Sequence, residues 1–321
     1  MIYFDNAATT LEKPQAVIDA VGAALTSFGG PGRGSHGPAI EASMALFRAR
    51  DAISRLLNVP GGSSRVAFAL NATMALNIAI ASLLPAGGRA VTTAASHNSV
   101  LRPLFRARDE RSCSVGVARI SPDGSLDEES YVRELAHGAD VVVSTHASNV
   151  TGDVYDVARM ATLAHEAGAL FVLDAAQTAG AYPLDMEALG VDVVCFTGHK
   201  SLYGPQGTGG LAVREGLDVA PLLEGGSGVK SFEERQPRLM PEALEAGTAN
   251  AHGAAGLAAG AEYVLDRGPH AIAEAANTLV ERFEEGIAGV SDVRLYGGRA
   301  SAGRTGVVAF NIGDADSGEV A

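Results

Sequence analysis

The chain has 321 residues, which is enough for one large domain or two moderate ones. Hydrophobic residues make up 47% of it and charged residues 19%, and this composition excludes an intrinsically disordered chain. With 24 basic and 37 acidic residues the net charge is −13, which argues against a protein that grips nucleic acid by neutralising phosphates.

Cysteine content and hydropathy indicate the cellular compartment and argue against a metal site and a membrane span. Cys113 and Cys195 are too few for a disulfide framework or a zinc cluster, and the histidines lack metal-ligand spacing, so we expect no metal site. The first residues show no signal peptide, and the most apolar stretch, 67–84, is interrupted by polar residues, so we expect no membrane span. These features predict a cytoplasmic protein in which Cys195 is a core residue and Cys113 a partly exposed bystander.

The N-terminal region contains a pattern that imitates a nucleotide site. Residues 32–37 match G-x-G-x-x-G, but a dinucleotide fingerprint follows a strand and opens a helix. Here residues 14–28 have the pattern of a helix, and Pro38 follows the motif at once. We therefore expect no nicotinamide site, and we keep Arg33 and His36 as candidates for reaching an active site.

From about residue 66 onward, short apolar runs alternate with helical patterns, which indicates a mainly parallel α/β sheet. A strand ending at 68–70 is followed by a helix from residue 72. Further strands are expected over 141–144, 170–173, 191–196 and 211–213, with a helix over 156–167 between the first two.

The last part of the chain predicts a second, smaller α+β domain. Helices are expected over 254–265 and 271–287, followed by a strand over 307–312. We expect residues 14–253 to form the large domain and residues 1–13 plus 254–321 to form the small one. Asp316 or Ser317 is a suitable helix N-cap, yet few residues follow it, so we expect the small domain to be incomplete.

Three successive predicted strands each deliver a polar residue just past their carboxyl ends. These residues are Asn149, Asp174 and Lys200, spaced 25 and 26 residues apart. Open α/β sheets bind ligands outside the carboxyl ends of their strands, so we expect the three side chains to converge. Taken alone, Asp174 is more simply a helix cap or an ion-pair partner, and Lys200 a solvated loop residue.

Considered together, these residues indicate one cofactor. A carboxylate opposite a cationic ring nitrogen and a lysine that forms a Schiff base are what pyridoxal phosphate requires. Lysine is scarce, with only Lys13, Lys200 and Lys230 in the chain. Ala72 and Thr73, at the expected start of a helix, can supply free N–H groups to a phosphate. His97 can stack on a ring and move protons as a catalytic residue, although a hydrogen-bonded loop histidine is an equally good interpretation.

Several segments resemble the cysteine desulfurases of the class-V aminotransferase family, which have the fold type I of pyridoxal-phosphate enzymes. In chain order they are MIYFDNAATT, GGPGRGSH, SHNSVLRPL, SNVTG, DAAQ, TGHKSLYGPQGTGG and EAGTAN. The resemblance covers nearly the whole chain, and it implies a mainly parallel seven-stranded sheet flanked by helices, with the smaller α+β domain truncated at its C-terminus.

The resemblance also implies a role for individual residues. Lys200 would hold the cofactor, Asp174 would pair with its ring nitrogen, and His97 would stack on the ring. Asn149 and Gln177 would contact the ring hydroxyl. The phosphate would be held by four residues of the same subunit and two of the neighbouring subunit of a homodimer, namely Ala72, Thr73, Thr197 and His199, then Gly247 and Thr248.

The activity that the resemblance implies is conversion of L-cysteine to L-alanine, with the sulfur passed to an enzyme cysteine and on to an acceptor protein, as in iron–sulfur cluster assembly. The family's cysteine and its substrate-binding arginine lie in a C-terminal loop that has no match in these 321 residues, and Ser96 stands where relatives often carry glutamate. A selenocysteine lyase, another β-eliminating lyase, an aminotransferase or a non-catalytic homologue are the alternatives.

Overall fold

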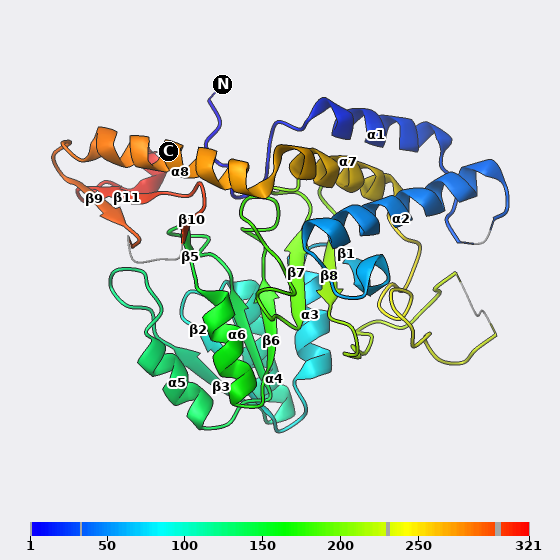
Figure 1. Ribbon diagram of the computed structural model, residues 1–321, viewed down its shortest axis with the longest axis horizontal. Helices are drawn as coiled ribbons and strands as arrows, with labels where there is room; N and C mark the ends of the chain where they lie inside the picture. Colours follow the sequence, from blue (N-terminus) through cyan, green and yellow to red (C-terminus); the bar gives the residue numbers. More distant parts are fainter. Residues whose placement is uncertain (1, 33, 229–231, 299–302, 321) are drawn as a thin grey trace.

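The computed structural model describes residues 2–32, 34–228, 232–298 and 303–320. Its centre is a seven-stranded sheet with strand order β1-β8-β7-β6-β4-β2-β3 (Figure 1). The strands are β1 Val66–Ala69, β2 Arg89–Thr93, β3 Ser114–Ala118, β4 Val141–Thr145, β6 Leu170–Asp174, β7 Val193–Thr197 and β8 Gly209–Val213. All pairings from β3 to β7 are parallel, which confirms the mainly parallel sheet.

Helices cover both faces of the sheet (Figure 1). One apolar core lies between the sheet and α2, α5, α6 and α7, and a second lies between the sheet and α3 and α4. The helices are α1 Gln15–Ser27, α2 Gly37–Leu56, α3 Ala72–Leu83, α4 Asn98–Arg111, α5 Glu128–Ala136, α6 Val157–Glu166, α7 Ala251–Arg267, α8 Pro269–Ile287 and α9 Ser317–Val320, with a short 3-10 helix at Gly62–Arg65.

The inner strands are apolar on both faces because each face packs on helices. Every residue of β4 and β7 is buried, as expected for parallel strands between two helical layers. Cys195 lies within β7 and is fully buried, which confirms it as a core residue. Cys113 was expected to be partly exposed, and this is wrong: it is 5% exposed because it packs under α3 and α4, where its Sγ lies 3.3 Å from the carbonyl of Pro85.

The remaining strands form two small pairs beside α8 (Figure 1). Strand β9, Val293–Tyr296, pairs with β11, Ala309–Ile312, and β10, Gly303–Arg304, pairs with β5, Asp153–Val154. Helix α7 packs instead along α1 and α2, and its Leu257 and Ala261 join the main core. The division into residues 14–253 and 1–13 plus 254–321 stays a prediction.

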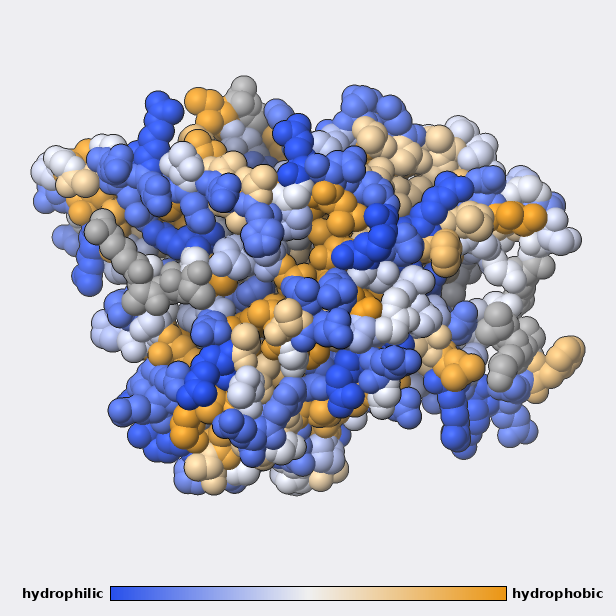
Figure 2. Space-filling model, viewed as in Figure 1, coloured by the Kyte–Doolittle hydropathy of each residue, from blue (hydrophilic) through white to orange (hydrophobic). Residues whose placement is uncertain are grey.

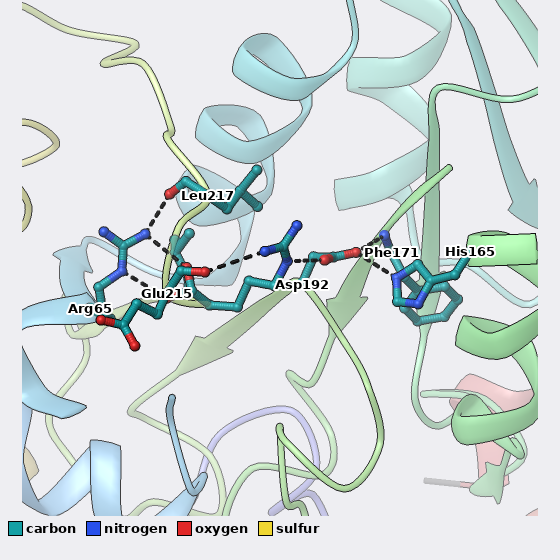
Figure 3. Close-up of polar contacts among 8 residues, drawn as sticks. Arg65, His165, Phe171, Asp192, Glu215 and Leu217 are labelled. Carbon is teal, nitrogen blue, oxygen red and sulfur yellow. Dashed lines mark hydrogen bonds and ion pairs between the residues drawn. The ribbon is translucent and has the colours of Figure 1, made fainter. Parts of the chain in front are cut away.

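A buried carboxylate joins three elements at the amino ends of β6 and β7 (Figure 3). Asp192, which is 2% exposed, accepts a 2.7 Å hydrogen bond from the backbone N–H of Phe171. It also pairs with Arg214, which follows β8, and with Nε2 of His165 on α6 at 2.9 Å. Asp192, Arg214 and His165 line a cavity of about 540 Å³ at the edge of the sheet opposite to Asp174.

We expect Asp192→Ala to lower the free energy of unfolding by about 3 kcal/mol, because the buried N–H of Phe171, the guanidinium of Arg214 and the imidazole of His165 lose their shared partner. Glu187→Ala is the matched control, since Glu187 lines the same cavity but is exposed. Urea denaturation of both variants measures the difference. Equal midpoints would show that Asp192 contributes nothing beyond an ordinary surface carboxylate.

Candidate active site

The parallel strands β4, β6 and β7 end at one edge of the sheet, where the predicted site residues lie. Asp174 is the last residue of β6 and Thr197 the last of β7, and the register pairs Thr145 with Asp174 and Asp174 with Cys195. Asn149 and Lys200 lie a few residues beyond the ends of β4 and β7. The sequence-based expectation that these positions share one edge is therefore borne out by the strand register.

Asp174 is a buried carboxylate with cationic neighbours. It is 3% exposed, and its Oδ1 accepts a 3.0 Å hydrogen bond from the backbone N–H of Ala176. Burial raises the pKa of Asp174, while electrostatic interactions with Lys200 and His97 act in the opposite direction. Lys200 and His97 are thus close enough to Asp174 to influence its ionisation electrostatically.

Lys200 lies in the turn between β7 and β8 and is half-buried. Burial lowers the pKa of its amine below the ordinary 10.5, and the negative charge of Asp174 opposes that shift. A half-buried amine with a lowered pKa has a larger neutral fraction near pH 8 than a solvated lysine. This is the property that a lysine nucleophile needs.

The N-terminal segment fixes the turn that carries Lys200. The hydroxyl of Thr10 donates to the carbonyl of Lys200 at 2.8 Å, and the N–H of Thr10 donates to the carbonyl of His199 at 3.0 Å. The hydroxyl of Thr9 lies 3.0 Å from Nδ1 of His199. Sequence reasoning did not assign roles to Thr9 and Thr10, although both belong to the FDNAATT motif that carried the resemblance.

His97 caps helix α4. Its Nδ1 accepts a 3.1 Å hydrogen bond from the backbone N–H of Ser99, which leaves the proton of the neutral ring on Nε2. The ring is exposed and, with Thr73, lines a cavity of about 270 Å³ between α3 and α4. The structure therefore places His97 and Thr73 on one concave surface.

Helix α3 begins beside this cavity with two residues whose N–H groups precede the first intrahelical hydrogen bonds, Ala72 and Thr73. The N-cap, Asn71, accepts instead from Met74 at 3.0 Å. In the described part of the chain, the Thr197 hydroxyl is buried and has no hydrogen-bond partner. Buried polar groups are normally paired, so these donors fit an anion such as a phosphate.

The other predicted cofactor contacts occupy more exposed positions. Asn149 is exposed at the tip of a turn, and the side-chain amide of Gln177 donates to the carbonyl of Ala7 at 3.3 Å. His199 is half-buried, and its pKa is lowered by burial and by Lys200 and Lys13. Their contacts with a cofactor stay predictions.

Gly247 and Thr248 are exposed on a segment that Glu245 fixes to the main core. Glu245 accepts a 2.7 Å hydrogen bond from the N–H of Phe68 and pairs with Arg50, while burial raises its pKa and Arg50 opposes this. Sequence reasoning missed Glu245, the first letter of EAGTAN.

Two residues of the 32–37 segment, Arg33 and His36, were expected as candidates for reaching the active site. His36 is the N-cap of α2, and Arg33 lies outside the described residues.

Taken together, the side chains at this edge of the sheet fit pyridoxal phosphate. The buried Asp174 carboxylate has one backbone donor on Oδ1 and suits a cationic ring nitrogen, the Lys200 amine suits an aldehyde, and the unpartnered Thr197 hydroxyl suits a phosphate oxygen. Among the described residues, no group of three or more histidine, cysteine or carboxylate side chains is gathered as a metal site. In the same part of the chain, no helix is both long and apolar enough to cross a membrane.

Comparison with known proteins identifies the family. Residues 2–321 match the family model described as Aminotransferase class-V. The chain belongs to the class-V aminotransferase family. It is 33% identical to a probable cysteine desulfurase from Pyrococcus abyssi over 97% of this chain and 79% of that protein. It is 32% identical to a cysteine desulfurase of Escherichia coli O127:H6 over 98% of this chain and 78% of the relative.

Solved structures support the same branch of the class-V aminotransferases. The apo cysteine desulfurase from Thermococcus onnurineus NA1 superposes with a TM-score of 0.92 at 32% identity, covering all of this chain and 81% of that one. The cysteine desulfurase CsdA from Escherichia coli gives a TM-score of 0.84 at 27% identity, covering 98% and 79%. Class-V aminotransferases and cysteine desulfurases depend on pyridoxal phosphate, and the chain is a member of the cysteine desulfurase group.

Proposed function

We propose that this chain binds pyridoxal phosphate through Lys200 and acts as a cysteine desulfurase on L-cysteine. The observation that carries the proposal is the half-buried Lys200 amine, with its lowered pKa, beside the buried carboxylate of Asp174. We assign the phosphate to Ala72, Thr73, Thr197 and His199, the ring hydroxyl to Asn149 and Gln177, and the ring face to His97. The names of the chain's relatives support the choice of substrate.

When bound, the cofactor supplies an electron sink for a bond that breaks at the Cα of an amino acid. Asp174 would keep the ring nitrogen protonated, because a cation there offsets the cost of burying the carboxylate. Lys200 is the base that would take the Cα proton at Nζ, since its lowered pKa leaves more of the amine neutral. His97 would cover the ring and hold it in place from the start of α4.

Sulfur transfer is not assigned to either cysteine of the chain. Cys195 is fully buried in β7, and burial together with Asp174 raises the pKa of its thiol well above the ordinary value. Cys113 is buried under α3 and α4. The Cys195 thiol is therefore a poor nucleophile, because the thiolate is the reactive form. Cys113 is shielded from a substrate by its burial.

We further propose a homodimer in which Gly247 and Thr248 reach the phosphate of the partner subunit, with a sulfur-acceptor protein as a second partner. Helices α1 and α2 support a dimer because they carry exposed apolar side chains. Figure 2 shows apolar atoms among hydrophilic ones at that end of the molecule. The apolar residues are Ile18, Leu25, Ile40, Met44 and Phe47.

The free cysteines fit a reducing compartment, and we propose the cytoplasm.

The proposal is tested by loading the protein with pyridoxal phosphate and incubating it with L-cysteine and excess dithiothreitol in D₂O, because neither Cys113 nor Cys195 is assigned to sulfur transfer and the added thiol must accept the sulfur. We expect a visible absorbance band and exchange of the cysteine Cα hydrogen for deuterium, because Lys200 moves the Cα proton, and we expect alanine and the persulfide of the added thiol as the products. NMR follows the exchange, and mass spectrometry identifies the product.

The product separates the proposal from its alternatives. Pyruvate would indicate a β-eliminating lyase, and a sulfur-containing keto acid an aminotransferase. Turnover of selenocysteine without turnover of cysteine would indicate a selenocysteine lyase. A protein that takes up no cofactor and exchanges no hydrogen would be a non-catalytic homologue. Lys200→Arg, which keeps the cation but cannot attach the cofactor covalently, is the control for exchange that does not depend on Lys200.

A further inference from the structure

The turn that presents Asn149 is fixed at its base and exposed at its tip. Ser148 and Asp153 are buried, whereas Asn149 is exposed. The hydroxyl of Ser148 accepts from the N–H of Val150 at 3.2 Å and from the N–H of Thr151 at 3.1 Å. These bonds join residues within the turn, so they do not attach the turn to other parts of the molecule.

A segment about 150 residues further along the chain supplies that orientation. Strand β10 pairs with β5, so that Gly303 lies opposite Val154 and Arg304 opposite Asp153. Directly after β10, the N–H of Thr305 donates to the carbonyl of Gly152 at 2.8 Å, and its hydroxyl lies 3.3 Å from the same oxygen. Thr305 is 4% exposed, so these bonds are shielded from water.

Arg304 makes a second connection between the turn and the region around α8. Its Nη2 donates to the carbonyl of Thr151 at 3.0 Å, and its Nη1 pairs with Glu284 of α8. The carboxylate of Asp153 accepts from the N–H of Gly298, just after β9, at 2.9 Å. The carbonyls of two turn residues and the side chain of a third are therefore held by Gly298, Arg304 and Thr305.

Gly152 shows how closely the two segments approach. Its φ of +80° lies in the left-handed region, and a Cβ at this position would stand 2.5 Å from the carbonyl oxygen of Val307. Any side chain at Gly152 therefore displaces either the turn or the segment that follows Thr305.

We propose that Arg304 and Thr305 are positioning residues for Asn149. They hold the 148–153 turn at the end of β4, so that the Asn149 amide stays at the edge of the cofactor ring. The proposal rests on the cofactor site proposed above. On this proposal, the orientation of Asn149 toward the cofactor ring depends on Arg304 and Thr305. These two residues belong to the region between α8 and β11, which contributes no residue to the assigned site.

Gly152→Ala tests the contact from the side of the turn, with Gly168→Ala as its matched control. Both glycines have a φ of +80°, but a Cβ at Gly168 meets nothing within 4 Å. Both variants therefore carry the same backbone strain, and only Gly152→Ala displaces the turn. We expect Gly152→Ala to weaken pyridoxal-phosphate binding about tenfold and to shift the cofactor absorbance band in the direction seen for Asn149→Ala. Gly168→Ala should leave both unchanged.

Arg304→Lys tests the contact from the other side. Lysine keeps a charge opposite Glu284 but lacks the second nitrogen that bonds the Thr151 carbonyl. If Arg304 acts through Asn149, Arg304→Lys weakens cofactor binding in the parent protein and has no further effect when combined with Asn149→Ala. Hydrogen exchange of the cofactor-free chain should show faster exchange at amides 150–154 in Arg304→Lys than in the parent.

Two results would overturn the positioning role. One is a Gly152→Ala protein whose cofactor affinity and absorbance match those of Gly168→Ala. The other is an Arg304→Lys effect that adds in full to Asn149→Ala. A parent protein that takes up no pyridoxal phosphate refutes the proposed function instead, and the hydrogen-exchange arm then still decides whether residues 303–305 hold the turn.

Discussion

We expect Lys200→Arg to abolish covalent attachment of pyridoxal phosphate completely. Arginine keeps a positive charge near Asp174, but its guanidinium does not lose its proton and cannot attack an aldehyde. After treatment with borohydride, mass spectrometry of the parent protein should show one added cofactor, located on the peptide that contains Lys200. The variant should show none.

Lys13→Arg is the control for this experiment. Burial lowers the pKa of Lys13 too, but its Nζ already donates to the carbonyls of Thr10 and His199, at 2.9 and 3.4 Å. A lowered pKa therefore does not single out Lys200, whereas the neighbouring carboxylate of Asp174 does. A label on Lys13, or on Lys230 outside the described residues, would refute the assignment.

In the parent protein, the rate of cofactor attachment should depend on pH with a defined sign. Attachment needs the neutral amine, so its rate should rise with pH through the pKa of Lys200 and level off above it. Because burial lowers that pKa, the midpoint should lie below the 10.5 of an ordinary lysine. A midpoint at or above 10.5 in stopped-flow absorbance would show that burial does not lower the pKa of the reacting amine.

The sheet and the three polar residues at its edge could be predicted because the signals are local. Strands buried on both faces give continuous apolar runs, and parallel strands put the residues that follow them at one edge. The antiparallel direction of β8 was not predicted. A signal for it exists, since only eleven residues separate β7 from β8 and a parallel crossover needs at least a dozen.

Contacts between distant segments could not be predicted from local patterns. Thr10 reaches Lys200 across 190 residues, and Thr305 reaches Gly152 across 153. Nothing in the residue types around Thr305 marks it as a partner of the Asn149 turn, because any backbone N–H can make its shorter bond. The burial of Cys113 has the same origin, since packing under α3 and α4 outweighs its polar sequence neighbours.

Replacing Asp174 with asparagine should change the cofactor-free and cofactor-bound proteins in opposite directions. Burial raises the pKa of Asp174, so without a cationic ring its charge costs folding energy that increases as pH rises through the pKa and disappears as pH falls below it. Asparagine removes that charge, and its oxygen can still accept from the N–H of Ala176. The cofactor-free variant should therefore gain about 1–2 kcal/mol in free energy of unfolding at pH 7.

With the cofactor bound, the same replacement should be damaging. An amide does not favour protonation of the ring nitrogen, so Cα hydrogen exchange should fall at least about 100-fold, while Lys200 still attaches the cofactor. Denaturation with and without pyridoxal phosphate, beside deuterium exchange, measures both effects, and Asp156→Asn, at an exposed helix cap, controls for loss of a carboxylate. A variant that is less stable without cofactor and exchanges at the parent rate would mean that Asp174 is a structural ion-pair partner, which is the simpler of the two interpretations its sequence position allows.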